Sequence, residues 1–148
     1  MEPLTLALDP DVLVNWMIRG TPRHAAALRL IEAEAGRSRA SLGLVPQVLH
    51  EFLHVATDPK RFEHPLSMSD AVARVRHLWD AREVVRILPD ATVLHRTLEL
   101  LSSLPLGRKR ILDTVLAATL QAAGVRRLAT FNGKDFEVFP FLEVVEPR

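Results

Sequence analysis

Acidic side chains occur at four points of this 148-residue chain where a short apolar segment or a helical pattern adjoins a turn. They are Asp9, Glu51, Asp113 and Asp135. Carboxylates gathered at one place repel one another, and hard divalent cations such as Mg²⁺ or Mn²⁺ relieve that repulsion. Such a site suits phosphodiester hydrolysis, because a metal lowers the pKa of a bound water and screens the charge of the phosphate. This chemistry depends on a fold that brings the four positions together.

Asp113 lies in a helical pattern whose apolar residues surround it. The apolar arc consists of Ile111, Leu112, Val115, Leu116, Ala118, Leu120 and Ala122. An uncompensated carboxylate in such a place costs on the order of several kcal/mol. Two compensators stay open on this segment: a metal ion, or an ion pair with Arg108, Lys109 or Arg110.

Short apolar segments alternate with amphipathic helical patterns along the whole chain, which predicts one α/β domain over residues 1–148 with a mainly parallel sheet. Strands are expected at 4–8, 40–45, 84–88, 126–131 and 142–145. Helices are expected between them, and the residues predicted to start them are Asp11, Thr21, Pro46, Ser67, Ala91 and Arg110.

The predicted sheet gathers the polar residues at one edge. Asp9 follows the first strand, and Asn132 and Asp135 follow the fourth. Glu51 and Asp113 lie early in helices, which begin at the carboxyl edge when they follow parallel strands. Because ligands of open parallel sheets bind beyond the carboxyl ends of the strands, we expect a single metal site there.

The composition is that of an ordinary globular protein, with 48% hydrophobic and 25% charged residues. The absence of cysteine excludes disulfides and thiolate metal sites, and it fits a reducing compartment. The net charge of +1 leaves the class of partner open, since nucleic-acid binding depends on how charge is distributed. Neither a signal peptide nor a bilayer-spanning run is visible, so we expect a soluble, cytoplasmic protein without a membrane partner.

Three parts of the chain resemble the PIN-domain nucleases, and most closely the VapC-type toxins of prokaryotic toxin–antitoxin pairs. They are LALDPDVLVNW, VPQVLHEFLHVATDP, and RILDTVLAATLQAAGVRRLATFNGKDF together with FPFLEVVEP. The resemblance covers nearly the whole chain in the family's order and spacing. It implies a Mg²⁺- or Mn²⁺-dependent endoribonuclease that cuts structured or ribosome-linked RNA and leaves 5′-phosphate and 3′-hydroxyl ends. It also implies a homodimer and a VapB-like antitoxin whose peptide enters the active groove.

The resemblance identifies Asp9, Glu51 and Asp113 with the first three acids of the family's site. The fourth position is less regular, because many relatives carry an acid where this chain has Asn132, and here an acid follows at Asp135. Asn132 can offer a neutral carbonyl oxygen to a metal or water. We predict that Asp135, with Asn132 in support, completes the metal site; the alternative role of Asp135 is to stabilise the turn before Phe136.

The chain departs from the family at Asp11, where relatives usually carry Asn, and we expect this residue to cap the first helix. Thr130 resembles the family's hydroxyl near the metal, and its alternative role is that of a β-branched strand residue. Arg108, Lys109 and Arg110 are predicted to form a basic rim that holds the RNA backbone.

Two phosphate-related classes share part of this pattern. Asp9 and Asp11 after an apolar strand also match the nucleophile motif of haloacid-dehalogenase-like phosphatases. That family requires a later acidic loop and a lysine facing the nucleophile, for which only Lys134-Asp135 is a candidate. A response-regulator receiver needs an acceptor at the end of the third strand, where Asp90 comes one residue late.

Two further alternatives concern metal and activity. The segment from His50 through Glu51 to His54 matches the H-E-x-x-H signature of zinc proteases. We disfavour that class, because the sequence offers no obvious third ligand and those enzymes do not begin with alternating short strands and helices. A catalytically inactive, PIN-like RNA-binding module stays open, since one expected acid is replaced.

Overall fold

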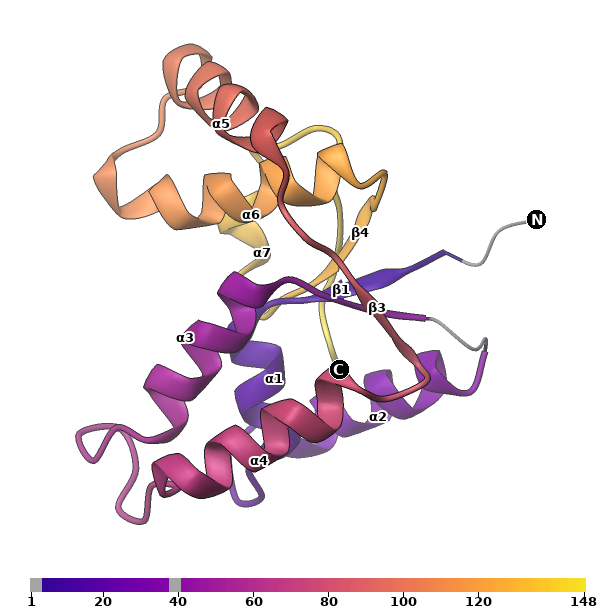
Figure 1. Ribbon diagram of the computed structural model, residues 1–148, viewed down its shortest axis with the longest axis vertical. Coiled ribbons are helices and arrows are strands. Elements are labelled where there is room, and N and C mark those ends of the chain that lie inside the picture. The colour runs from indigo at the N-terminus through magenta and orange to yellow at the C-terminus, as the bar shows by residue number, and fades with distance from the viewer. Residues whose placement is uncertain (1–3, 38–40) are drawn as a thin grey trace.

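Within residues 4–37 and 41–148, which the computed structural model describes, five short strands form one sheet in the order β3-β2-β1-β4-β5 (Figure 1). The strands are β1 (Leu6–Leu8), β2 (Leu42–Leu44), β3 (Val84–Arg86), β4 (Arg127–Ala129) and β5 (Glu143–Val145). Every pairing is parallel, which confirms the predicted class of fold. Each strand is shorter than predicted, and Ala40, the expected start of the second strand, lies outside the described residues.

Helices connect the strands and cover both faces of the sheet. They are α1 (Pro10–Met17), α2 (His24–Ala35), α3 (Pro46–Ala56), α4 (Met68–Trp79), α5 (Ala91–Ser103), the 3₁₀ turn η1 (Arg108–Arg110), α6 (Ile111–Ala122) and α7 (Gly133–Phe136). In Figure 1, helices α1 to α4 gather below the sheet and α5 and α6 lie above it. Contacts follow the same division, because α1 packs on α2 and α3, α3 packs on α4, and α5 packs on α6. Among the described helices, none combines the length and apolarity needed to cross a bilayer.

Several helix starts confirm the local prediction. The Ser67 hydroxyl accepts the Asp70 backbone N–H at 3.0 Å, which caps α4. Asp90 caps α5 in the same way by accepting the N–H of Thr92 at 2.8 Å. Pro46 opens α3, where the missing proline N–H costs nothing because that group has no helical partner.

Two predicted caps are wrong. Asp11 lies inside the first turn of α1, because Pro10 already occupies the first helical position and moves the cap position back to Asp9. Thr21 lies three residues before the start of α2 and does not cap it. Its hydroxyl donates instead to the carbonyl groups of Asn15 and Ile18 at 3.2 and 3.0 Å. Asp11 is therefore free for another role, and Thr21 closes the turn between α1 and α2.

The predicted apolar arc of α6 is wrong over its first turn, where Ile111 is 43% exposed and Leu112 is 57% exposed. Burial begins one residue after the acid, and the buried residues are Thr114, Leu116, Ala117, Ala118, Thr119 and Leu120. Asp113 is consequently half-buried at the start of the helix and is not enclosed in the core.

The order of the strands changes direction at β1, which lies in the middle of the sheet. The chain adds β2 and β3 on one side, and then returns to add β4 and β5 on the other. The carboxyl ends of β1 and β4 therefore flank a topological switch point, where ligands of open α/β sheets bind. Leu8 pairs with Ala129, and the Asp9 N–H donates to the Ala129 carbonyl at 3.0 Å. The residues that follow these two strands must then lie side by side.

Candidate functional site

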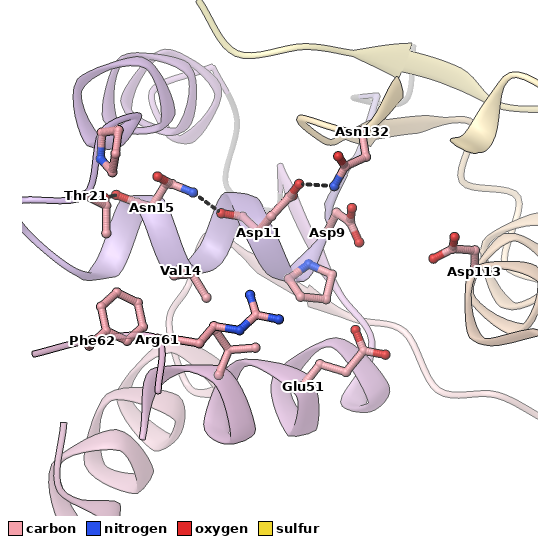
Figure 2. A pocket seen from close by; sticks show the side chains of 13 residues that line it. Asp9, Asp11, Val14, Asn15, Thr21, Glu51, Arg61, Phe62, Asp113 and Asn132 are labelled. Atoms are coloured by element: carbon pink, nitrogen blue, oxygen red, sulfur yellow. Dashed lines mark hydrogen bonds between the residues drawn. The ribbon is translucent and has the colours of Figure 1, made fainter. Parts of the chain in front are cut away.

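A cavity of about 450 Å³ opens beyond the carboxyl ends of the strands (Figure 2). Its walls come from the β1–α1 turn, α1, α3, the loop after α3, α6 and the loop after β4. They consist of Asp9, Pro10, Asp11, Val14, Asn15, Thr21, Pro22, Glu51, Val55, Arg61, Phe62, Asp113 and Asn132. Three of the predicted acids, Asp9, Glu51 and Asp113, thus share one cavity although 104 positions separate the first from the last along the chain (113 − 9 = 104).

Asp9 is the most buried acid of the cavity, with 7% of its surface exposed. Its Oδ2 accepts a 2.7 Å hydrogen bond from the hydroxyl of Thr130, which is itself fully buried. The backbone N–H of Asn132 donates to that hydroxyl at 3.0 Å, so the hydroxyl proton is directed at Asp9. Burial, and then the charge of Asp11, raise the pKa of Asp9 to about 8, and the hydrogen bond from Thr130 opposes the rise.

Asp11 also belongs to the cavity, a place that sequence reasoning missed because a carboxylate after a strand has an ordinary explanation as a cap. The side-chain amide of Asn132 donates to Oδ2 of Asp11 at 2.8 Å (Figure 2). Its other oxygen, Oδ1, is buried and has no hydrogen-bond partner among residues 4–37 and 41–148. Burial raises the pKa of Asp11, and the nearby N–H groups of Val12 and Phe131 oppose part of the rise.

Glu51 on α3 and Asp113 on α6 face the cavity from other sides (Figure 2). The Gln47 amide donates to Glu51 Oε1 at 3.4 Å and to the Leu112 carbonyl at 2.9 Å, which joins α3 to the start of α6. Burial is the largest cause of a raised pKa at both acids. The charge of Asp113 adds to the rise at Glu51, while Arg110 opposes the rise at Asp113.

Arg110 connects two of the predicted acids. Its Nε lies 3.2 Å from Asp113 Oδ2, and its Nη1 lies 3.4 Å from Asp135 Oδ1. Its Nη2 also donates to the backbone carbonyl of Asp135. The cavity wall therefore includes Asn132 but not Asp135, which stands behind the Arg110–Asp113 pair. Of the predicted basic rim, Arg108 and Lys109 are exposed, whereas Arg110 turns toward the acids.

The chemistry of these side chains fits a hard divalent cation. Within residues 4–37 and 41–148, no three acids or histidines are grouped closely enough to constitute a metal site by themselves. The four cavity carboxylates nevertheless present only oxygen ligands, which Mg²⁺ and Mn²⁺ prefer. A buried carboxylate oxygen without a donor and four raised pKa values indicate negative charge that a cation would compensate.

The rival patterns do not assemble in the same way. Glu51 faces the cavity, whereas His50 borders a separate groove with Trp79, so the H-E-x-x-H side chains diverge. Lys134 is exposed on α7 and is not part of the cavity wall. Asp90 caps α5 on the surface. Asp9 and Asp11 do lie together, which is the part of the phosphatase pattern that the fold retains.

Sequence reasoning also missed Arg61, an exposed cation in the cavity wall. It follows α3 in a loop without periodicity, and loop residues give no signal of the direction in which they point. Arg23 is a second unpredicted cation near the site, and its guanidinium lies 4.7 Å from the centre of the Phe131 ring. Its charge acts on Asp11 and lowers the pKa of that acid slightly against the effect of burial.

Comparisons with known proteins find relatives along nearly the whole chain. The family model described as PIN domain matches residues 6–142. Ribonuclease VapC24 of Mycobacterium tuberculosis is 30% identical over 142 residues, which are 96% of either chain. The crystal structure of M. tuberculosis VapC20, a sarcin-ricin loop cleaving toxin, has a TM-score of 0.69 and 18% identity over 91% of this chain and 95% of that one. VapBC2 from Rickettsia felis, bound to a promoter DNA fragment, has a TM-score of 0.65 and 16% identity over 98% of this chain and 100% of that one.

Proposed function

The chain belongs to the PIN domain family, and on that premise we propose that it is a divalent-metal-dependent endoribonuclease, the toxin of a type II toxin–antitoxin pair. The observation that carries the proposal is the cavity shared by Asp9, Glu51 and Asp113 at the switch point of the sheet. The ribonuclease VapC24 and the loop-cleaving toxin VapC20 support the choice of RNA as the substrate.

Asp9, Glu51 and Asp113 would hold Mg²⁺ or Mn²⁺, with Asn132 in the same wall. Asp135 contributes its charge from behind Arg110. When bound, the ion would supply Lewis acidity and screen the negative charge of the phosphodiester.

The protein's own groups orient the acids. The Thr130 hydroxyl fixes the rotation of the Asp9 carboxylate, and the Gln47 amide restrains Glu51. Arg110 holds Asp113 at the rim. Burial raises the pKa of Glu51, which makes its carboxylate a better proton acceptor than an exposed one. Orientation by fixed neighbours is what keeps acid groups in productive geometry.

Cations around the acidic cavity would hold the RNA. Arg108 and Lys109 are exposed on η1, directly before the helix that carries Asp113. Arg61 stands in the cavity wall between α3 and α4. Exposed positive side chains of this kind bind backbone phosphates without reading sequence.

The partners follow from the same assignment. The likeness to VapBC2 and to a toxin–antitoxin complex from Klebsiella pneumoniae supports a VapB-like antitoxin whose peptide occupies the cavity. We further expect a homodimer, a single functional domain over residues 1–148, and action in the cytoplasm, where the RNA substrate is found.

A cleavage assay with the purified, antitoxin-free protein tests the proposal. RNA and a small phosphate ester are each incubated with the protein, once with Mn²⁺ and once with chelator. The nuclease predicts RNA cleavage in Mn²⁺ that the chelator abolishes. Turnover of the ester alone would indicate the haloacid-dehalogenase-like phosphatase that uses Asp9 and Asp11. RNA binding without cleavage in either condition would indicate an inactive RNA-binding module.

A further inference from the structure

Asp11 and Asn132 form a direct side-chain pair across the switch point of the sheet. Asp11 follows β1 and Asn132 follows β4, and the Asn132 amide donates to Asp11 Oδ2 at 2.8 Å. Both residues line the cavity, as Figure 2 shows. Asp11 Oδ1 is buried and has no hydrogen-bond partner in the part of the chain that the structure describes. A buried carboxylate oxygen without a partner is costly, so its retention calls for a ligand.

The ordinary structural roles do not account for this carboxylate. The cap position of α1 is Asp9, and no side-chain hydrogen bond caps that helix. An acid in the first turn gains only about 0.3–1 kcal/mol from the helix dipole. Arg23, the residue before α2, places its guanidinium over the Phe131 ring; its charge lowers the pKa of Asp11, but it makes no hydrogen bond to Oδ1. Asp11 thus adds a partly buried charge beside Asp9, and the groups around it leave one of its two oxygens without a hydrogen bond.

We propose that Asp11 is the fourth cation-binding carboxylate of the site and that Asn132 is the residue that positions it. This assignment rests on the proposed metal-dependent nuclease. Asp135 is the competing candidate, but its carboxylate is engaged by Arg110 outside the cavity wall. The neutral amide of Asn132 donates to one oxygen of Asp11 and leaves the other without a hydrogen bond, so the pair carries one negative charge and one restrained carboxylate.

The pair offers a matched interchange, because Asp and Asn have nearly the same shape. Asp11→Asn alone removes one charge from the cavity. Asp11→Asn combined with Asn132→Asp restores the charge and retains an amide–carboxylate hydrogen bond with the two roles exchanged. A role that depends on charge at this place is rescued by the interchange, whereas a role that depends on Asp11 as a specific structural residue is not.

Calorimetric titration of the metal-free protein with Mn²⁺ tests the assignment, together with the melting temperature in chelator. Asp11→Asn is expected to weaken Mn²⁺ binding at least about tenfold, the loss typical when a group of a metal site is removed. Its melting temperature in chelator is expected to rise, because repulsion with Asp9 is relieved. The interchanged double variant is expected to bind Mn²⁺ within about threefold of the parent, a difference smaller than one ligand is worth. Asn132→Ala is expected to lose affinity to a smaller degree than Asp11→Asn, since the charge remains.

Each contrary result has one meaning. If Asp11→Asn binds Mn²⁺ as tightly as the parent and melts at a lower temperature in chelator, Asp11 is structural and the assignment is overturned while the metal-dependent function stands. If the double variant binds as weakly as Asp11→Asn, charge at this place is not enough and the cation-binding assignment of Asp11 is overturned. If Asn132→Ala binds Mn²⁺ as tightly as the parent, the positioning role of Asn132 is overturned. If the parent itself binds no Mn²⁺, the proposed function and this assignment fail together.

Discussion

The hydroxyl of Thr130 donates a 2.7 Å hydrogen bond to Oδ2 of Asp9, and both side chains are buried where β1 and β4 end. The register of the two central strands produces this contact, because Leu8 pairs with Ala129 and the next residue of each chain segment faces the other. The sequence left Thr130 two roles, a hydroxyl near the metal site or a β-branched strand residue. The structure shows that the hydroxyl contacts the most buried acid of the cavity.

Thr130→Val is expected to lower activity, because it keeps the shape of the side chain and removes the only part that binds Asp9. The pKa of Asp9 then rises further, since the Thr130 hydrogen bond is what opposes the effect of burial. Leaving a buried acceptor unsatisfied costs about 1–3 kcal/mol of stability. Thr130→Ser, which keeps the hydroxyl, is the matched control. Equal RNA cleavage rates for the valine and serine variants would show that the hydroxyl does not matter.

The metal-free protein is expected to lose stability as the pH rises. The pKa of Asp9 is about 8 in the folded protein and near its ordinary 3.8 when unfolded, so the folded state holds an extra proton between these values. Stability that is fully present below pH 3.8 is therefore lost as the pH rises toward 8, on the order of 1 kcal/mol per unit. Asp11, Glu51 and Asp113, whose pKa values are also raised, act in the same direction.

Urea unfolding in chelator measures this effect. It is carried out at about pH 5.5, 6.5 and 7.5, which lie between the unfolded and folded pKa values of Asp9. Asp9→Asn is the control, and its unfolding free energy should change less with pH. Added Mn²⁺ should stabilise the parent most at the highest pH, where the carboxylates are ionised. An unfolding free energy that increases from pH 5.5 to 7.5 in chelator would contradict the raised pKa values.

The three basic residues before Asp113 are expected to have two different roles, RNA binding and the positioning of Asp113. Arg108→Gln and Lys109→Gln should weaken RNA binding and each reduce the salt slope by about one, because both side chains are exposed and able to contact phosphates. Arg110→Gln should lower cleavage with little change in the salt slope, because its guanidinium is held by Asp113 and Asp135. RNA binding in chelator at several salt concentrations distinguishes them. An equal change in the salt slope for all three variants would show that Arg110 also contacts the RNA.

The buried ion pair of Glu34 with Arg127 supplies an acid for comparison at the opposite end of the sheet. Their side chains are 6% and 12% exposed, and Oε1 lies 2.8 Å from Nη2. Glu34→Gln leaves Arg127 with a weaker partner, and breaking such a pair costs about 3 kcal/mol. We expect a lower melting temperature with unchanged cleavage per folded molecule. A loss of cleavage that exceeds the loss of folded protein would show that cleavage depends on acids throughout the molecule.

The sequence was sufficient for the sheet because each buried strand is a short apolar run bounded by a turn, and parallel pairing then assigns Asp9 and Asn132 to one edge. It was not sufficient for side-chain direction. Pro10 fixes the start of α1 and turns Asp11 into the cavity, where its partner lies 121 positions away. The four-residue helix α7 is too short to show periodicity, yet it decides that Asn132 lines the wall and Asp135 does not.

Cleavage of RNA in Mn²⁺ by Asp113→Asn, compared with Glu34→Gln, tests the central claim most directly. Both changes remove one acidic charge, but only Asp113 lies in the cavity. We expect Asp113→Asn to melt as a folded protein and to cut at least about a hundredfold more slowly than the parent, while Glu34→Gln cuts at the parental rate. If folded Asp113→Asn cuts RNA as fast as the parent, the carboxylates of this cavity are not a metal-dependent nuclease site.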